Sequence, residues 1–148
     1  MEKHYYGYDE FRDDTRVLKN KVAEFEAEAI VAIARGGYSV AHALAEGLNI
    51  RNLQSIRTEL YDEDRKRENI TISGTCSFEN IKKVLVVDDI ADSGETLSHV
   101  MEYLTKSHPD VEFCSATLFY KKTSMYEPTY WVKEAKNWID FFWERDFL

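Results

Sequence analysis

The sequence lacks the features that mark several specialised classes of protein. Its only two cysteines, Cys76 and Cys114, have no metal-binding spacing, and we expect reduced thiols in a cytoplasmic protein, because no signal peptide is evident. No run approaches the roughly 18 apolar residues that a transmembrane helix needs, which argues against membrane insertion. The chain also lacks an excess of positive charge: it has 19 basic and 27 acidic residues, and the formal net charge of -8 argues against binding to nucleic acid or to a membrane surface.

What remains is the composition of an ordinary globular domain. Of the 148 residues, 44% are apolar and 31% are charged. The sequence contains no internal repeat and no low-complexity segment. A chain of this length can bury a real core, and we expect a single domain over residues 1–148.

One stretch, Lys83–Thr105, carries most of the information about function. Val84–Val87 is a short apolar run rich in β-branched residues, which is typical of a strand buried on both faces of a parallel sheet. Two carboxylates, Asp88 and Asp89, follow it, and a polar turn with one glycine comes next, over Ala91–Thr96. Apolar residues then repeat at helical spacing, at Leu97, Val100, Met101 and Leu104.

This order of strand, acidic pair, loop and helix predicts a ligand site. Open α/β sheets bind their ligands at the carboxyl ends of parallel strands. A loop that contains glycine and leads into a helix presents free backbone N–H groups to an anion. The carboxylates of Asp88 and Asp89 suit ribose hydroxyls or a hydrated Mg²⁺. A sugar that carries a phosphate would use both halves of the site.

A second unit of strand, loop and helix lies upstream. Ala29–Ala34 reads as a buried strand, and Arg35-Gly36-Gly37 follows it, with Ser39 as a plausible N-cap of a helix and Gly47 as its stop. The glycines and the arginine charge suit an anion, but a tight turn that requires positive φ would explain the glycines equally well.

The remaining elements frame these two units. The apolar stripe of Phe11, Leu18, Val22 and Phe25 indicates a packing helix over residues 9–28. Leu53–Arg57 is a predicted strand, and a long charged loop, Thr58–Asn69, leads to a predicted edge strand over Ile70–Thr75. A few of the loop cations Arg65, Lys66 and Arg67 could close over a phosphorylated ligand.

The C-terminal third is unusually aromatic. Ser107–Asp110 stops the helix, and Val111–Tyr120 is a predicted strand that ends in Lys121-Lys122. Residues 123–137 read as irregular, apart from a short strand near Tyr130. The aromatic segment Trp138–Glu144 either packs onto the sheet or a subunit interface, or offers a face to a flat ligand.

The motif VLVVDDIADSGETL, Val84–Leu97, resembles the phosphoribosyl pyrophosphate motif of type I phosphoribosyltransferases. The other elements agree in order: Arg35-Gly36-Gly37 resembles the pyrophosphate loop of the family, and Thr58–Asn69 resembles its flexible lid. The lysine-ended strand with Trp138–Ile139 resembles the purine-binding hood of the short bacterial xanthine-guanine enzymes. The chain departs from the family at three positions: Ser93 stands where threonine is commoner, Phe142 replaces a proline, and Glu95 brings a negative charge that can point outward.

The resemblance implies a fold and an activity. The fold is α/β and Rossmann-like: a parallel twisted sheet flanked by helices, with a flexible lid at about residues 58–75 and a small hood at about 121–148. The activity is Mg²⁺-dependent transfer of 5-phosphoribose from phosphoribosyl pyrophosphate to a 6-oxopurine (xanthine, guanine or hypoxanthine) in purine salvage. Family habit suggests a homodimer or homotetramer.

The resemblance also implies roles for individual residues. Asp88 and Asp89 bind the ribose hydroxyls and Mg²⁺, and Asp92 is the catalytic base at the purine N7. The purine contacts are Lys121 (with Lys122 as second choice), Asp92, the Trp138 ring and the Ile139 backbone. The phosphoribosyl pyrophosphate contacts are Arg35, Gly36, Gly37, Asp88, Asp89, Ile90, Ala91, Asp92, Ser93, Gly94, Glu95 and Thr96. The Ala34–Arg35 peptide is expected to be cis.

Three other interpretations remain. A response-regulator receiver also contains a strand ending in two acids, but its acidic pair should lie near the N-terminus, and too little chain follows Asp89 for its further strand–helix units. A phosphoribosyltransferase-like regulator would bind the ligand without catalysis, although Arg35, Asp92 and the long charged loop favour an enzyme. The acceptor could also be orotate, adenine or uracil, but the lysine and the Trp-Ile pair favour a 6-oxopurine.

Overall fold

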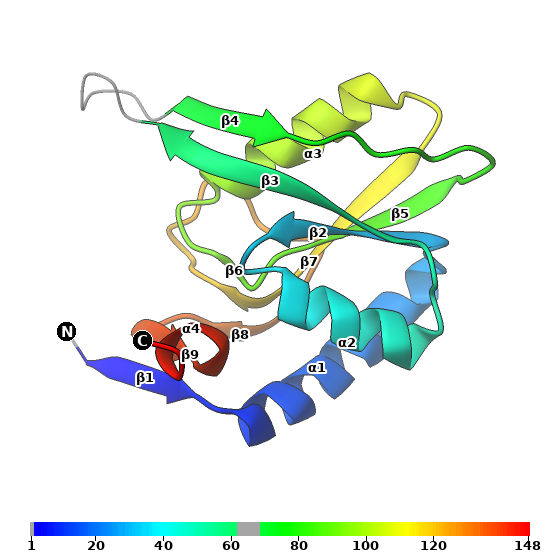
Figure 1. Cartoon of the computed structure of the whole chain (residues 1–148). Helices are drawn as coiled ribbons and strands as arrows, with labels where there is room; N and C mark the ends of the chain where they lie inside the picture. Colours follow the sequence, from blue (N-terminus) through cyan, green and yellow to red (C-terminus); the bar gives the residue numbers. More distant parts are fainter. Residues whose placement is uncertain (1, 62–68) are drawn as a thin grey trace.

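A mostly parallel sheet forms the centre of the molecule (Figure 1). The computed structural model describes residues 2–61 and 69–148, and within them the sheet has seven strands in the order β4-β3-β2-β5-β7-β6, with β8 paired to β7. All strand pairs are parallel except β3 with β4. The strands are β2 (Ala29–Ala34), β3 (Leu53–Tyr61), β4 (Asn69–Ser73), β5 (Lys83–Val87), β6 (Ile90–Ala91), β7 (Glu112–Tyr120) and β8 (Tyr130–Glu134).

Helices cover both faces of the sheet. One face packs against α1 (Tyr8–Val22), which continues into a 3₁₀ turn over Ala23–Phe25, and against α2 (Tyr38–Leu48). The opposite face packs against α3 (Glu95–Ser107). The expected fold, a parallel sheet flanked by helices, is therefore confirmed. No helix in the described part of the chain is long and apolar enough to cross a membrane.

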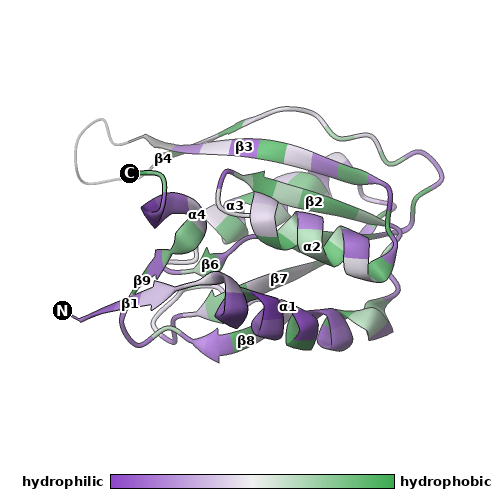
Figure 2. Cartoon of the chain, turned by 60° about the horizontal axis from the view of Figure 1, so that its bottom comes forward, coloured by the Kyte–Doolittle hydropathy of each residue, from purple (hydrophilic) through white to green (hydrophobic). Residues whose placement is uncertain are grey.

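The buried residues of the central strands explain the apolar runs in the sequence. Ala29–Ile33 of β2 and Val84–Val87 of β5 are all buried, with alternate residues serving the two cores. Figure 2 shows the hydrophobic colour along β2, whereas α1 alternates between hydrophilic and hydrophobic residues. The predicted apolar stripe of α1 is buried, as its pattern requires.

The ends of α2 differ from the prediction. The helix begins at Tyr38 with Gly37 at its N-cap, so Ser39 is not the cap. It ends at Leu48, and the C-cap residue Asn49 adopts the left-handed conformation with φ 55°. Gly47 lies inside the helix instead of ending it. A Cβ atom there would lie 3.0 Å from Cδ of Lys19, so this glycine lets the Lys19 side chain cross α2 closely.

The predicted loop at Thr58–Asn69 is wrong at both ends. Strand β3 continues to Tyr61, and β4 begins at Asn69, because the two pair antiparallel with Arg57 opposite Ser73 and Tyr61 opposite Asn69. The backbone hydrogen bonds between β3 and β4 extend the strands into a charged stretch whose side chains show no apolar periodicity. The predicted edge strand is confirmed. The cations expected to close over the ligand, Arg65, Lys66 and Arg67, lie outside the described residues.

A second, two-stranded sheet joins segments from the two ends of the sequence. Strand β1 (Lys3–Tyr6), which was not predicted, pairs in parallel with β9 (Trp138–Phe141), and α4 (Phe142–Arg145) follows β9. The Trp143 ring stacks on Phe141 with their centroids 4.6 Å apart, and Phe142 packs against the core. Packing thus explains most of the aromatic segment, whereas Trp138 is 56% exposed.

Candidate active site

The ends of three adjacent parallel strands bring the predicted site residues together. In register, Ala32 of β2 lies beside Val87 of β5, and Val87 lies beside Ala116 of β7. The loops after β2 and β5 therefore leave the same edge of the sheet, where open α/β folds bind ligands.

The two glycines after β2 are needed for space. Gly37 has φ -79°, and Gly36 is not among the residues with positive φ, so a turn that requires positive φ does not explain them. A Cβ atom on Gly36 would lie 2.5 Å from Oδ2 of Asp89, and one on Gly37 would overlap the Val87 carbonyl oxygen. The Ala34–Arg35 peptide that precedes them is cis, as the family resemblance implies.

The acidic pair after β5 lies in a poorly solvated position. The Asp89 backbone N–H donates to Oδ1 of Asp88 at 2.8 Å, and Asp89 is only 7% exposed. Burial raises the pKa of Asp88 well above its usual range, and the Asp89 carboxylate raises it further. Burial also raises the pKa of Asp89, to about 6, and the Glu144 carboxylate adds to this. Such a pair favours a counter-charge beside it, and its hard oxygen ligands suit Mg²⁺.

The loop after the acidic pair leads into α3. Gly94 has φ 85° and lies at the N-cap, and the Glu95 N–H donates to Oγ of Ser93 at 3.2 Å. The first backbone N–H groups of α3 therefore border a cavity of about 790 Å³. The residues that line it are Asp88, Asp89, Ile90, Ala91, Asp92, Ser93, Gly94, Glu95, Thr96, Leu97, Lys121, Thr123 and Met125.

The segment 121–126 holds this loop in place. The Lys121 N–H donates to the Ala91 carbonyl at 3.0 Å, and the Met125 N–H donates to the Ser93 carbonyl at 2.8 Å. Gly94 lies so close to the segment that a Cβ atom would overlap Oγ of Ser124. The sequence did not single out Thr123 and Met125 as lining residues, because they lie in a stretch without regular pattern or motif.

Glu95 differs from its expected orientation. It lines the cavity, and its Oε2 atom is buried with no hydrogen-bond partner among the described residues. The side chain therefore does not point into solvent, although it occupies the first position of α3.

A second cavity of about 450 Å³ adjoins the first. The two share Asp89, Ile90, Asp92 and Lys121, so they form neighbouring parts of one site. The other residues that line the second cavity are Ala135, Lys136, Asn137, Trp138, Ile139, Phe141 and Glu144. The predicted purine contacts are thus gathered around one hollow, with Glu144 as an addition that the sequence did not suggest.

The two lysines after β7 take different directions. Lys121 lines both cavities, and its Nζ lies 3.5 Å from Oδ1 of Asp92. Lys122 lines neither, and its Nζ lies 3.4 Å from Oε1 of Glu134. Arg35 is exposed and lines neither cavity, although the adjoining Gly36 lies so close to Asp89 that it leaves no space for a Cβ atom. The roles of these residues remain predictions.

Similarity to known proteins extends over almost the whole chain. Residues 10–146 match the family described as phosphoribosyl transferase domain. The xanthine-guanine-hypoxanthine phosphoribosyltransferase of Helicobacter pylori is 35% identical, with a TM-score of 0.92 over 99% of this chain and 96% of that one. A purine phosphoribosyltransferase from Pyrococcus horikoshii is 28% identical, with a TM-score of 0.84 over 97% and 94%. The xanthine-guanine phosphoribosyltransferase of Idiomarina loihiensis is 27% identical over 95% of this chain and 86% of its own length.

Proposed function

Because the chain belongs to the phosphoribosyltransferase family, we propose that it transfers 5-phosphoribose from phosphoribosyl pyrophosphate to a 6-oxopurine in purine salvage. The products are the nucleoside monophosphate and pyrophosphate. The observation that carries the proposal is the division of the site into two adjoining cavities that share Asp92 and Lys121. One has the acidic pair and the helix N-terminus that a phosphorylated sugar needs, and the other has an aromatic wall and a lysine. Relatives named for xanthine, guanine and hypoxanthine support the class of acceptor.

The donor half is suited to phosphoribosyl pyrophosphate. The backbone N–H groups and the hydroxyls of the Ala91–Thr96 loop would bind the 5′-phosphate, as helix N-termini bind anions elsewhere. Asp88 and Asp89 would accept hydrogen bonds from the ribose hydroxyls. Arg35 and the Gly36–Gly37 amides would stabilise the charge of the leaving pyrophosphate, which is the main electrostatic demand of the reaction.

A magnesium ion fits the acidic pair. Among the described residues no group of three or more His, Cys, Asp or Glu side chains is arranged to hold a metal, so protein ligands alone form no closed site. Mg²⁺ usually binds through one or two carboxylates and takes its other ligands from water and substrate phosphates. When bound, it would neutralise negative charge on the leaving pyrophosphate. Asp88 and Asp89 would hold it.

The acceptor half orients the purine. Trp138 would stack on the ring, the Ile139 backbone would contact the 2-substituent, and Lys121 would donate to the 6-oxo group. Asp92 lies between the two cavities, where its carboxylate can take the proton that leaves the purine N7. Its Oδ1 atom lies 3.5 Å from Nζ of Lys121, so the proposed base and the proposed purine-binding lysine are neighbours. Catalysis would then come from in-line alignment, a stabilised leaving group and exclusion of water from an oxocarbenium-like transition state.

A coupled spectrophotometric assay tests the proposal. Purified protein is given phosphoribosyl pyrophosphate and Mg²⁺ with guanine, xanthine, hypoxanthine, adenine or orotate in turn, and each reaction is repeated with a chelator. We expect turnover with at least one 6-oxopurine and loss of turnover with the chelator. Turnover with adenine or orotate alone would identify a different acceptor. Binding of phosphoribosyl pyrophosphate without turnover of any base would identify a regulator.

Assembly and location complete the proposal. We propose a homodimer or homotetramer in the cytoplasm, where the half-buried thiols of Cys76 and Cys114 would stay reduced. Sedimentation analysis of the purified protein measures the assembly, and a monomer at micromolar concentration would contradict it.

A further inference from the structure

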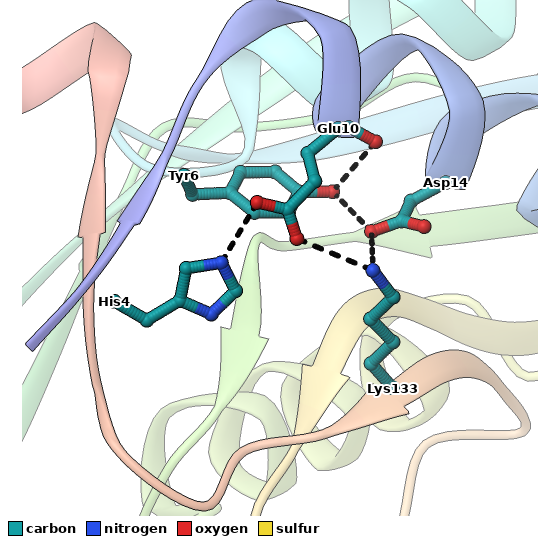
Figure 3. A network of polar contacts seen from close by, with 5 residues as sticks. All are labelled: His4, Tyr6, Glu10, Asp14 and Lys133. Atoms are coloured by element: carbon teal, nitrogen blue, oxygen red, sulfur yellow. Dashed lines mark hydrogen bonds and ion pairs between the residues drawn. The ribbon is translucent and has the colours of Figure 1, made fainter.

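A network of five polar side chains joins three elements of the fold (Figure 3). The His4 ring nitrogen Nε2 lies 2.7 Å from Oε1 of Glu10, and the other oxygen of Glu10 lies 3.2 Å from Nζ of Lys133. The same ammonium lies 3.1 Å from Oδ2 of Asp14, which also accepts a hydrogen bond from the Tyr6 hydroxyl at 2.8 Å. The five residues come from β1, α1 and β8.

Two members of this network are more buried than the residues of a typical surface ion pair. Tyr6 is fully buried and Asp14 is 6% exposed. Burial raises the pKa of Tyr6, and its hydrogen bond to Asp14 adds to the effect. Partial burial opposes the charge of Lys133, but hydrogen bonds to Asp14 and Glu10 outweigh it and raise the pKa of the ammonium. Breaking such a network leaves a buried polar group without its partner, which costs more than losing an exposed pair.

None of the five residues lines the second cavity, which we call the purine cavity, but three of them lie on strands that are next to it or lead into it. In the β1–β9 pair, His4 lies opposite Ile139 and Tyr6 lies opposite Phe141. The Tyr6 ring meets the edge of the Phe141 ring with centroids 5.6 Å apart, and Phe141 lines the cavity. Lys133 lies near the end of β8, just before Ala135–Asn137, which also line the cavity.

Strand β9 has no backbone link to the main sheet. Within the described residues it pairs with β1 alone, in a separate two-stranded sheet. Its distance from Asp92 and Lys121 is therefore set by side-chain contacts, both its own, such as that of Phe141 with Phe119 at 5.9 Å between ring centroids, and those of β1 with the rest of the fold. The network adds buried polar contacts to these, because it connects β1 to α1 and α1 to β8.

We propose that Tyr6, Asp14 and Lys133 are positioning residues for the purine: they hold β8 and β9 against α1 so that the Trp138–Phe141 wall faces Asp92 and Lys121. This inference rests on the proposed function, since it concerns the acceptor half of that site. A small displacement of the wall would weaken purine binding and leave the donor loops unaffected, because those loops are held by β2, β5 and the segment 121–126.

Steady-state kinetics of Lys133→Met tests the inference, with Lys106→Met as the matched control. Lys106 pairs with Glu102 at 2.7 Å on the exposed surface of α3. Both variants therefore remove one lysine charge, but Lys106→Met breaks one exposed ion pair, whereas Lys133→Met breaks two pairs within the network. We expect the purine KM of Lys133→Met to rise about tenfold or more, since misplacement by about 1 Å can cost about 100-fold. The KM for phosphoribosyl pyrophosphate should change by less than about twofold, because among the described residues the donor loops do not contact the network and the effect there should be as small as that of losing a surface ion pair. Lys106→Met should change neither.

Two further variants keep the test decisive if Lys133→Met does not fold. Tyr6→Phe removes only a hydroxyl and should raise the purine KM in the same direction. Lys133→Arg keeps the charge and should restore most of the purine affinity. If these variants lower the melting temperature while both KM values stay unchanged, or raise both KM values alike, the network is merely structural and the inference is overturned.

Wild-type turnover separates the two claims. An inactive wild-type protein would refute the proposed function itself. An active wild type whose purine KM is insensitive to Lys133→Met and Tyr6→Phe would refute only the positioning role.

Discussion

Asp88 and Asp89 are two adjacent carboxylates at the end of β5, placed where water solvates them poorly. Their raised pKa values mean that ionising them costs free energy in the ligand-free protein. The positive charge of a metal and the hydroxyls of a sugar would offset this cost. The pair therefore favours binding at the expense of stability, a conflict that is common in active sites.

The first prediction concerns the pH-dependent loss of stability that the Asp89 carboxylate causes in the ligand-free protein. The pKa of Asp89 is raised from 3.8 to about 6, so the folded state binds more protons than the unfolded state between these values, and stability falls as pH rises through this window. Asp89→Asn removes the cost. We expect its free energy of unfolding to exceed that of the wild type by about 1–3 kcal/mol at pH 8, without ligand. Turnover should fall.

Urea denaturation at two pH values measures this effect. The difference between Asp89→Asn and the wild type should shrink below about pH 4, because both forms then carry a neutral side chain. A variant that is less stable than the wild type at both pH values would show that the carboxylate stabilises the fold.

The second prediction concerns Asp92. Replacing it with asparagine keeps the size of the side chain and removes the base. We expect kcat to fall by about 100-fold or more, which is the usual contribution of a general base. The affinity for phosphoribosyl pyrophosphate, measured by calorimetry, should change far less. Equal losses in both quantities would refute the assigned role.

The third prediction separates the two lysines after β7. Lys121 lines both cavities and Lys122 pairs with Glu134 outside them. We expect Lys121→Ala to raise the purine KM by about tenfold, the value of one hydrogen bond to a charged group. Lys122→Ala is the matched control and should leave it unchanged. The reverse pattern would reassign the purine contact to Lys122.

At the scale of elements, the phosphate loop is shaped by a neighbouring segment as much as by its own sequence. Segment 121–126 bonds to the loop through the backbone N–H groups of Lys121 and Met125, and it packs against Gly94. The donor loop and the purine lysine are thus held by the same piece of chain. A change in the Ala91–Thr96 loop should therefore also alter the binding of the purine.

The fourth prediction tests this contact with a pair of glycines. Gly94 and Gly74 both have positive φ, at 85° and 106°, so alanine is strained at either position. At Gly94 a Cβ atom also overlaps Ser124, whereas at Gly74 its nearest neighbour lies 3.7 Å away. Gly74→Ala should therefore cost only the backbone strain of about 1 kcal/mol, and Gly94→Ala distinctly more. Thermal unfolding measures both costs.

Binding separates the two glycines further. Gly94→Ala should weaken the binding of phosphoribosyl pyrophosphate in calorimetry, because the loop must move away from Ser124. Gly74→Ala should leave this binding unchanged. If Gly94→Ala and Gly74→Ala had the same effects on stability and on binding, segment 121–126 would have moved aside at no cost and would not hold the loop in place.

At the scale of the whole molecule, the sequence predicted the parts of the fold that follow from local pattern. The apolar runs of β2 and β5 and the helical spacing of α3 come from burial on one or two faces, which a sequence displays directly. The resemblance in Val84–Leu97 predicted the family and the class of reaction, and the relatives confirm both. The assigned roles of single site residues remain predictions.

Other parts depend on partners distant in sequence and could not be read locally. Strand β1 has only four residues, and its pairing with β9 leaves no periodic signal. Gly47 lies inside α2 instead of ending it, and the side chain that passes closest to it, Lys19, belongs to another helix. Thr123 and Met125 line the donor cavity only because the segment folds back over the Ala91–Thr96 loop. Each of these facts concerns tertiary contact, which local propensity does not encode.

The pairing of β1 with β9 also has a consequence for biosynthesis. Strand β1 leaves the ribosome long before β9 does, and until β9 emerges it lacks its backbone partner. The strands that carry the donor loops, β2 and β5, are complete well before that moment. A nascent chain arrested between β8 and β9 would therefore contain both donor loops but no wall for the purine, so the capacity to bind the acceptor should appear late in translation.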